Sequence, residues 1–215
     1  MRLQSPMWRP ARHLHFTVFS AALLLAIPIS GCRVHTHEGG NGQQVHVDTP
    51  FGGLHVDTNQ TTAADLGLPV YPGAQVVADK DNDKSADVHM GFGKWELRVK
   101  AVNYTSPENE DKIVAFYKKA MGRYGDVIAC QNDAPVGTAA ATSEGLTCAD
   151  SGKSGEHVQV AGTYDSSRGD YELKAGSPHH QHIVAFESSA PGQTRFTLVA
   201  LDLPQISGQS SSKSD

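Results

Sequence analysis

Residues 95–104 read WELRVKAVNY, which is the clearest strand pattern in the chain and the starting point for its fold. Apolar side chains occupy every second position from Trp95 to Ala101, and Glu96, Arg98 and Lys100 lie between them. Successive side chains of a strand point to opposite faces of a sheet. This alternation therefore predicts a strand with one face in a core and the other in water.

A helix is predicted directly after that strand. Ser106 suits the N-cap and Pro107 suits the first helical position. Acidic residues then lie at the positive end of the helix dipole and basic residues at its negative end, with Gly125 as a suitable stop. One apolar stripe at helical spacing comprises Ile113, Phe116, Tyr117, Ala120, Met121 and Tyr124.

Further runs of period two predict a sheet around this helix. They cover residues 74–78, 87–92, 126–130, 146–149, 157–164, 170–175, 182–187 and 195–201. The last run is apolar on both faces, which favours a central place in the sheet. We therefore expect an α+β domain over residues 68–205, mainly an antiparallel β-sheet with one principal helix packed on a face.

An internal repeat precedes that domain. His-Val-Asp-Thr occurs at 46–49 and again at 55–58, with the turn signal Pro50-Phe51-Gly52-Gly53 between the two copies. The alternation in each arm predicts a β-hairpin over 45–58 with one apolar and one polar face. A lone hairpin is marginal in water, so its apolar side should dock on the main body or on a partner.

Three polar segments flank these units. Residues 32–44 are Gly-rich and lack periodicity, which predicts a flexible tether. Residues 59–67 form a polar linker, and residues 206–215 form a polar tail that we expect to be disordered.

The first 31 residues predict a signal peptide. Three arginines and no acid precede an apolar run at 16–29, which is too short to span a bilayer. The run leads into Ile29-Ser30-Gly31-Cys32, and this order resembles the lipobox of bacterial lipoproteins. The resemblance implies cleavage before Cys32 and its acylation. The alternative is an ordinary secretory signal before an incidental cysteine.

The same resemblance implies a location. Bacterial lipoproteins carry three acyl chains, palmitate among them, which makes the membrane a lasting partner. Arg33 follows the cysteine where inner-membrane lipoproteins often carry Asp, which favours the outer membrane, facing the periplasm. An envelope protein is a further expected partner.

Two cysteines remain after lipidation of Cys32. Exported proteins fold in an oxidising compartment, where leftover thiols usually pair. Cys130 and Cys148 therefore predict a structural disulfide. A two-cysteine metal site and a cysteine nucleophile are the alternatives.

Charge excludes one class of function. The 215 residues include 18 Lys and Arg against 23 Asp and Glu, a formal charge of −5, and the basic residues form no cluster. Nucleic-acid binders are basic, so no nucleic-acid partner is expected. Loss of the signal lowers the charge to −8 because three arginines leave with it. Such a body is not attracted to anionic lipid head groups, so the acyl chains must hold it at the membrane.

Three longer motifs carry a family resemblance: VDTPFGGLHVDT, LGLPVYPGA and DKIVAFYKKAMGRYGDVI. Together they resemble a group of uncharacterised bacterial envelope lipoproteins over most of the mature chain. The resemblance supports the domain division and the anchor. It implies no activity, catalytic residue or ligand.

Histidine is the compositional anomaly, with 11 residues. The densest group, His179-His180-Gln181-His182, provides candidate ligands for Zn or Cu in His179, His180 and His182. His46 and His55, paired across the hairpin, could contribute with Asp48 or Asp57. The alternative is that these histidines occupy turns and polar strand faces and that the protein has no cofactor.

No catalytic residue is predicted. The chain lacks Gly-x-Ser-x-Gly, His-Glu-x-x-His and a phosphate-binding loop, and its Ser210-x-x-Lys213 falls in the tail. We therefore expect a non-catalytic binding or assembly module on a lipid anchor rather than an enzyme. The alternatives are a transition-metal-binding lipoprotein and a hydrolase with dispersed catalytic residues.

Overall fold

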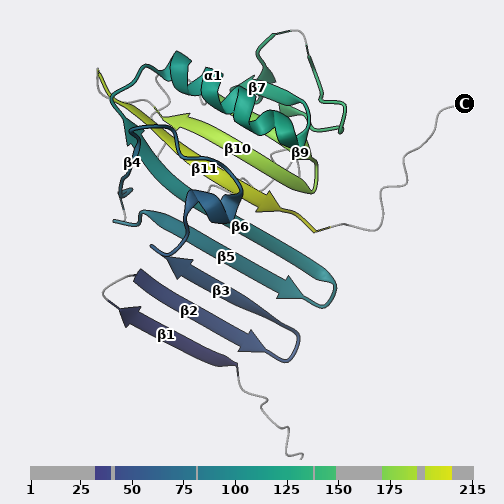
Figure 1. The fold of residues 1–215 in the computed structure, drawn as a ribbon. Helices are drawn as coiled ribbons and strands as arrows, with labels where there is room; N and C mark the ends of the chain where they lie inside the picture. Colours follow the sequence, from purple (N-terminus) through teal and green to yellow (C-terminus); the bar gives the residue numbers. More distant parts are fainter. Residues whose placement is uncertain are drawn as a thin grey trace, which may run out of the picture.

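The computed structural model describes residues 32–204, except 40–41, 81, 138, 149–170 and 188–191. Within these ranges, eleven strands form one antiparallel sheet, and a single α-helix lies across one of its faces (Figure 1). From edge to edge the strands follow the order β1-β2-β3-β5-β6-β11-β10-β9-β7-β8, and β4 pairs with β6 beside this path. The expected α+β class with a mainly antiparallel sheet is confirmed.

The strands are β1 (Arg33–Gly39), β2 (Gly42–Thr49), β3 (Gly52–Thr58), β4 (Gln75–Val76), β5 (Ser85–Phe92), β6 (Trp95–Ser106), β7 (Val127–Gln131), β8 (Ala134–Pro135), β9 (Tyr171–Ser177), β10 (His180–Glu187) and β11 (Thr194–Asp202). The helix α1 covers Glu110–Met121, and the 3-10 turns η1 and η2 cover Ala63–Leu66 and Gly122–Tyr124. The strands predicted at 87–92, 95–104, 126–130, 182–187 and 195–201 are thus confirmed to within a few residues, as is the described part of 170–175.

The main core lies between α1 and the half of the sheet that contains β6, β11, β10 and β9. The helix buries one stripe completely, and the strands bury the alternate positions that face it. The buried helix side chains are Ile113, Tyr117 and Met121, and their strand neighbours include Val102, Leu173, Val184, Phe196 and Leu198. None of the helices in the described ranges has the length and hydropathy needed to span a bilayer.

Strand β11 has the central place that its two apolar faces predict, because it lies between β6 and β10. Phe196 and Leu198 belong to the core under α1. Val199 points to the opposite face, where it packs with Val99 and Ala101 in a second apolar cluster. Both faces of this strand are therefore buried.

The helix begins later than predicted. Its N-cap is Asn109, whose Oδ1 accepts a hydrogen bond from the backbone N–H of Asp111 at 2.8 Å. Ser106, the predicted cap, is the last residue of β6 and is buried opposite Thr194 of β11. Continued strand pairing therefore delays the helix, because Ser106 is still held in the sheet.

The predicted hairpin is present as β2 and β3, with His46 opposite His55. Docking of its apolar side on the main body is wrong, since β3 instead pairs along its edge with β5, where Leu54 lies opposite Met90. Docking of that side on a partner stays a prediction. Edge pairing gives the backbone groups of both strands their hydrogen-bond partners. The hairpin thus extends the main sheet.

The predicted flexible tether over 32–44 is also wrong for the residues that the structure describes. They form β1 and the start of β2, with Val34 opposite Val47 and His35 opposite His46. The polar, Gly-rich composition concealed an edge strand whose side chains are all exposed. Cys32 consequently lies at the margin of the sheet, directly before β1.

Two other predictions need correction. The run 74–78 contributes only the two residues of β4. The predicted strand at 146–149 is absent from its described part, where Thr147 forms an isolated bridge with Ala141. Leu146 and Cys148 are both buried, and Thr147 between them is partly exposed, because the disulfide holds this loop against β7. The signal peptide at 1–31, the strand predicted at 157–164 and the tail at 206–215 lie outside the described residues.

The predicted disulfide between Cys130 and Cys148 is confirmed. Both half-cystines are buried beside Ile128. Next to them, the buried Nζ of Lys174 donates to the carbonyl of Cys148 at 3.3 Å and forms an ion pair with Glu172 at 2.8 Å. The bridge therefore fastens the loop before Cys148 to β7, and Lys174 fastens it to β9.

We expect the variant Cys130→Ala/Cys148→Ala to lose about 2–5 kcal/mol of unfolding free energy, because the bridge restricts the unfolded chain. Urea unfolding followed by circular dichroism measures this loss. Both chains carry Cys32→Ala so that neither is attached to lipid, and the chain that keeps the bridge is the reference. An unchanged midpoint in the double variant would show that the bridge contributes nothing.

Candidate functional site

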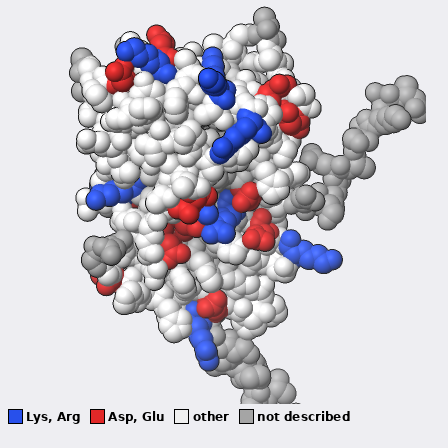
Figure 2. Space-filling view, in the orientation of Figure 1, with Lys and Arg blue, Asp and Glu red and all other residues white. Residues whose placement is uncertain are grey.

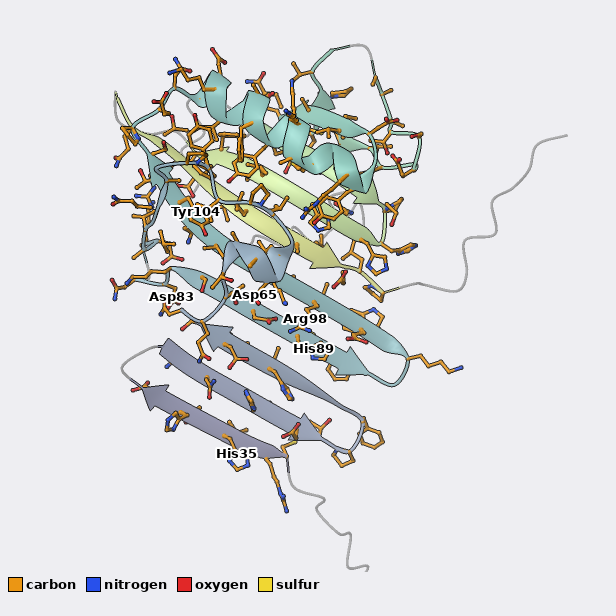
Figure 3. The ribbon with its side chains drawn as sticks, in the orientation of Figure 1. His35, Asp65, Asp83, His89, Arg98 and Tyr104 are labelled. Carbon is orange, nitrogen blue, oxygen red and sulfur yellow. A yellow bond between two sulfur atoms is a disulfide. The ribbon has the colours of Figure 1, made fainter. Side chains whose placement is uncertain are left out.

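A row of polar side chains crosses the face of the sheet that carries α1, in the half formed by β1, β2, β3 and β5 (Figure 3). Cross-strand register aligns four histidines, one from each strand, which we call the histidine row: His35, His46, His55 and His89. The same register continues through Arg98 of β6 and Asp202 of β11 to His180 of β10. The row therefore links the edge strand to the centre of the sheet.

The repeat in the sequence explains the partners of the central histidines. The two arms run antiparallel, so each histidine lies diagonally across from the aspartate of the other arm. His46 Nε2 is 3.7 Å from Asp57 Oδ1, and His55 Nε2 is 3.4 Å from Asp48 Oδ1. The two imidazole rings stack with centroids 4.4 Å apart.

The fourth histidine of the row repeats this arrangement, with His89 Nε2 2.9 Å from Glu96 Oε1. All these side chains are partly exposed, and polar contacts between exposed side chains contribute little to stability. The row therefore forms a hydrophilic surface rather than a stabilising network.

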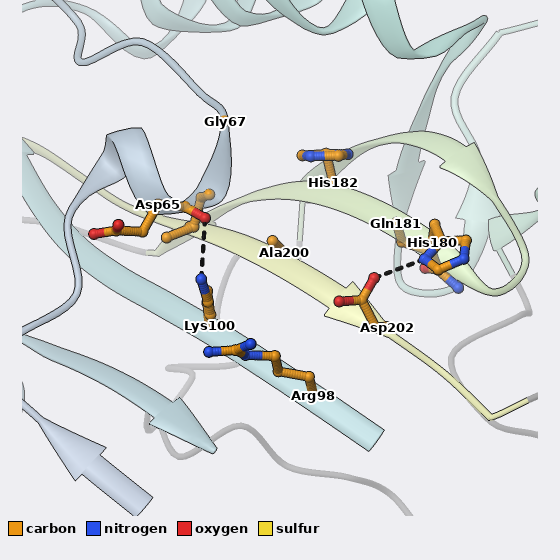
Figure 4. A pocket seen from close by; sticks show the side chains of 10 residues that line it. Asp65, Gly67, Arg98, Lys100, His180, Gln181, His182, Ala200 and Asp202 are labelled. Atoms are coloured by element: carbon orange, nitrogen blue, oxygen red, sulfur yellow. Dashed lines mark hydrogen bonds and ion pairs between the residues drawn. The ribbon is translucent and has the colours of Figure 1, made fainter. Parts of the chain in front are cut away.

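Two adjoining hollows lie between the histidine row and the core, and Figure 4 shows the first of them. The first has a volume of about 310 Å³ and is lined by η1 with its following glycine and by β6, β10 and β11; its polar lining residues are Asp65, Arg98, Lys100, His180, Gln181, His182 and Asp202. The second, of about 290 Å³, shares Asp65, Arg98 and Lys100 and adds Gln44, Asp57, Gln60, Thr61 and Asp87. Together they form one polar groove, which we call the η1 groove.

The charges in the η1 groove are mixed. Figure 2 shows acidic and basic side chains gathered across the middle of this face. Arg98 donates two hydrogen bonds to the Asp87 carboxylate, at 3.1 and 2.8 Å, and this carboxylate raises the pKa of Arg98. Lys100 Nζ donates to the backbone carbonyl of Asp65 at 3.3 Å and forms no ion pair with any described residue. Lys100 is therefore the cation of the groove that is free to bind a carboxylate from outside.

The rim of the groove is fixed by the capping of η1. Thr62 donates from both its hydroxyl and its backbone N–H to the Asp65 carboxylate, at 2.7 and 2.9 Å. These hydrogen bonds lower the pKa of Asp65, with a smaller contribution from the charge of Lys100. Gly67 ends the turn with a φ of 69°, the left-handed conformation that glycine adopts without a steric penalty.

His182 has a structural position at the inner wall of the groove. Its ring stacks on Tyr124, with centroids 3.6 Å apart, and hydrogen-bonds to the backbone of Leu66. The Tyr124 hydroxyl donates to the carbonyl of Gly67 at 2.6 Å. Together, His182 and Tyr124 hold the end of η1 over the sheet.

The structure does not assemble the predicted metal ligands. His180 and His182 share a face of β10, as expected, but His180 Nδ1 pairs with Asp202 at 2.7 Å while His182 stacks on Tyr124. His179 lies in the preceding turn. In the described part of the chain, no three His, Cys, Asp or Glu side chains come together in a way that could hold a metal ion. His46 and His55 are adjacent across the hairpin as predicted, and Asp57 and Asp48 lie 3.7 and 3.4 Å from them.

The most informative groove residues were missed at the level of sequence. Arg98 and Lys100 were identified from the sequence only as polar positions on the water-facing side of a strand. Asp202 and Asp65 stand more than thirty residues away from them along the chain, and only the pairing of β11 with β6 and the position of η1 bring them close. The alternation in β6 predicted that Arg98 and Lys100 share a face of the sheet. It could not predict which residues of other elements lie beside them.

Comparisons with protein-family models, with curated proteins and with solved structures found no match. The resemblance to envelope lipoproteins therefore stays a prediction from the sequence motifs.

We expect His182 to make the protein less stable in acid. Burial lowers the pKa of His182 in the folded state, and the nearby charge of Arg123 lowers it further, while the Leu66 carbonyl and Asp202 act in the opposite direction. As the pH falls below the ordinary histidine value of about 6.5, the unfolded chain takes up the proton first. The stability contributed by neutral His182 is therefore present above that pH and is lost below it.

Urea unfolding at about pH 7.5 and about pH 5.5 tests this expectation. The variant His182→Gln should lose less stability on acidification than the parent protein. His37→Gln, which removes an imidazole from the exposed edge strand, is the control. Equal losses in the parent and in His182→Gln would contradict the assignment.

Proposed function

We propose that this protein is a lipid-anchored component of the bacterial cell envelope, held at the outer membrane and facing the periplasm, with a non-catalytic binding module as its folded part. The η1 groove is the binding surface. Its ligand is a polar envelope component that presents a carboxylate to Lys100. The single observation that carries the binding role is this lysine, which faces two polar hollows without an ionic partner among the described residues.

Two features support the anchor. Cys32 follows the apolar run and the small residues Ser30 and Gly31, and it is exposed and outside any disulfide. The other two cysteines form a buried bridge, which is typical of proteins that fold in an oxidising compartment. The three cysteines thus divide into one available for acylation and two that stabilise the fold.

The composition of the groove favours binding over catalysis. Arg98 is occupied by Asp87, and His180 is paired with Asp202. His182 is engaged with Leu66 and Tyr124. His180 keeps Nε2 available as a base, but none of the residues that line its hollow carries a hydroxyl or thiol for it to activate. Lys100, in contrast, suits the recognition of a carboxylate through a charge-assisted hydrogen bond.

Substitution Cys32→Ala should release the protein from membranes, because it removes the site of acylation. Fractionation of cells that express the full chain, followed by mass spectrometry of the mature N-terminus, measures the release and the missing acyl mass. The variant Cys130→Ala/Cys148→Ala changes two other cysteines and should remain acylated. A Cys32→Ala chain that still fractionates with lipid would overturn the anchor.

Substitution Lys100→Glu should abolish partner binding, because it places a repelling charge where the partner's carboxylate is expected. We expect at least a roughly tenfold loss, as for a lost charge-assisted hydrogen bond. Lys119→Glu makes the same charge change on the exposed surface of α1 and is the matched control. Both variants can be compared with the parent by crosslinking in intact membranes and quantitative mass spectrometry.

The binding role predicts one component that the parent and Lys119→Glu capture and that Lys100→Glu does not. Equal capture by all three chains, or no reproducible capture by any, would contradict it. Thermal unfolding checks that each variant is folded. A charge change at an exposed position should alter the free energy of unfolding by no more than about 0.5 kcal/mol.

A further inference from the structure

The position of Cys32 relates the proposed anchor to one end of the sheet. Cys32 precedes β1, whose first residue, Arg33, lies opposite Asp48 near the end of β2. The β2–β3 turn and the β5–β6 turn lie at this same end, as Figure 1 shows. Any acyl chain on Cys32 would therefore bring these two turns close to the lipid surface.

Three large aromatic side chains are exposed at this end. Phe51, in the β2–β3 turn, is 84% exposed, and Phe92 and Trp95, on either side of the β5–β6 turn, are 48% and 37% exposed. The rings of Phe92 and Trp95 lie 6.0 Å apart. Phe92 also lies opposite Gly52. The Phe92 ring packs so closely on this glycine that a Cβ at position 52 would lie 2.6 Å from it. We call these three residues the aromatic edge.

Two residues of the aromatic edge continue an apolar strip of the sheet. Phe92 and Trp95 pair with each other two positions beyond the pair Met90 and Leu97, so all four point to the same face. This face is opposite to the histidine row. Leu54, beside Met90, extends the strip and is only half-buried, as are Met90 and Leu97.

We propose that the aromatic edge lies in the interfacial layer of the lipid bilayer, in the leaflet that holds the acyl chains of Cys32. Tryptophan settles at the level of the lipid head groups, and phenylalanine favours the adjoining hydrocarbon. Arg33 and Lys94 are exposed at the same end and suit contact with lipid phosphates.

Two exposed carboxylates also lie near this end, on the face of the sheet opposite to the apolar strip. Asp48 and Glu96 lie on the face of the histidine row, where they face His55 and His89. Phe92 and Trp95 point to the other face, so the aromatic edge contacts the bilayer from the side of the sheet that carries no carboxylate at these positions. If the β2–β3 and β5–β6 turns contact the bilayer, the opposite end of the sheet projects away from the membrane.

This inference rests on the proposed acylation, and Trp95 allows the two to be tested separately. The chain has two tryptophans, and the other, Trp8, belongs to the predicted signal peptide. Trp95 is thus the single tryptophan of the mature protein. Its fluorescence reports on the aromatic edge alone.

The experiment uses the mature protein purified from membranes and placed in phosphatidylcholine vesicles, with and without bromine on the acyl chains. Brominated lipid should lower Trp95 emission roughly twofold, because an indole at the head-group level touches the upper acyl chains. Acrylamide in the water should quench this emission less than that of the soluble Cys32→Ala chain. Phe51→Ser/Phe92→Ser should weaken the lipid quenching, while Val70→Ser, at an exposed valine elsewhere, should leave it unchanged.

Three results would overturn the inference. An acylated protein whose Trp95 is quenched by acrylamide but not by brominated lipid would keep its anchor and lose the aromatic contact. A Trp95 protected from both quenchers would show that a protein surface, such as a second copy, covers the edge. A mature chain without acyl mass would remove the anchor and the inference with it.

Discussion

Strand β6 forms hydrogen bonds along both of its edges, and both halves of the molecule depend on this double pairing. Its segment from Arg98 to Val102 pairs with β5 on one side and with β11 on the other. A central strand leaves few backbone groups without partners, so its conformation is strongly determined. The face toward α1 carries Arg98, Lys100, Val102 and Tyr104 in turn. The groove therefore begins where the core ends, on a single strand.

The two halves of the sheet use their faces differently. Where α1 covers the sheet, burial of the apolar positions provides the hydrophobic stabilisation of the fold. Beyond Lys100, the same face turns polar and carries the histidine row, and the opposite face keeps an apolar strip that ends at Phe92 and Trp95. This amphipathic half is compatible with the lipid anchor proposed at Cys32, which would place the aromatic edge at the bilayer and leave the η1 groove in water.

The sequence predicted the elements better than their boundaries and connections. Alternation identified β6 and β11, and helical spacing identified the buried stripe of α1. Local signals misplaced the start of α1, because Ser106 has the chemistry of a cap and yet is held in the sheet by Thr194 of β11. Composition likewise concealed β1, since an edge strand with both faces in water needs no apolar alternation. For the site, the histidines of the repeat were recognised, but their supposed metal role found no ligand set among the described residues.

The sequence by itself determined the alternating patterns, the helix stripe, the pairing of Cys130 with Cys148 and the repeat that places His46 beside His55. The strand patterns, the helix stripe and the repeat depend on residues that are close along the chain. The disulfide could be predicted because only two cysteines remain once Cys32 is set aside. Only the tertiary structure decided that the hairpin extends the sheet, that Asp65 and Lys100 meet at a groove, and that Cys32 lies at the same end of the sheet as Phe51 and Trp95. Such contacts depend on which strand edges pair and in what register, and many pairings satisfy the same local alternation. The burial of the whole chain, rather than any one segment, selects among them.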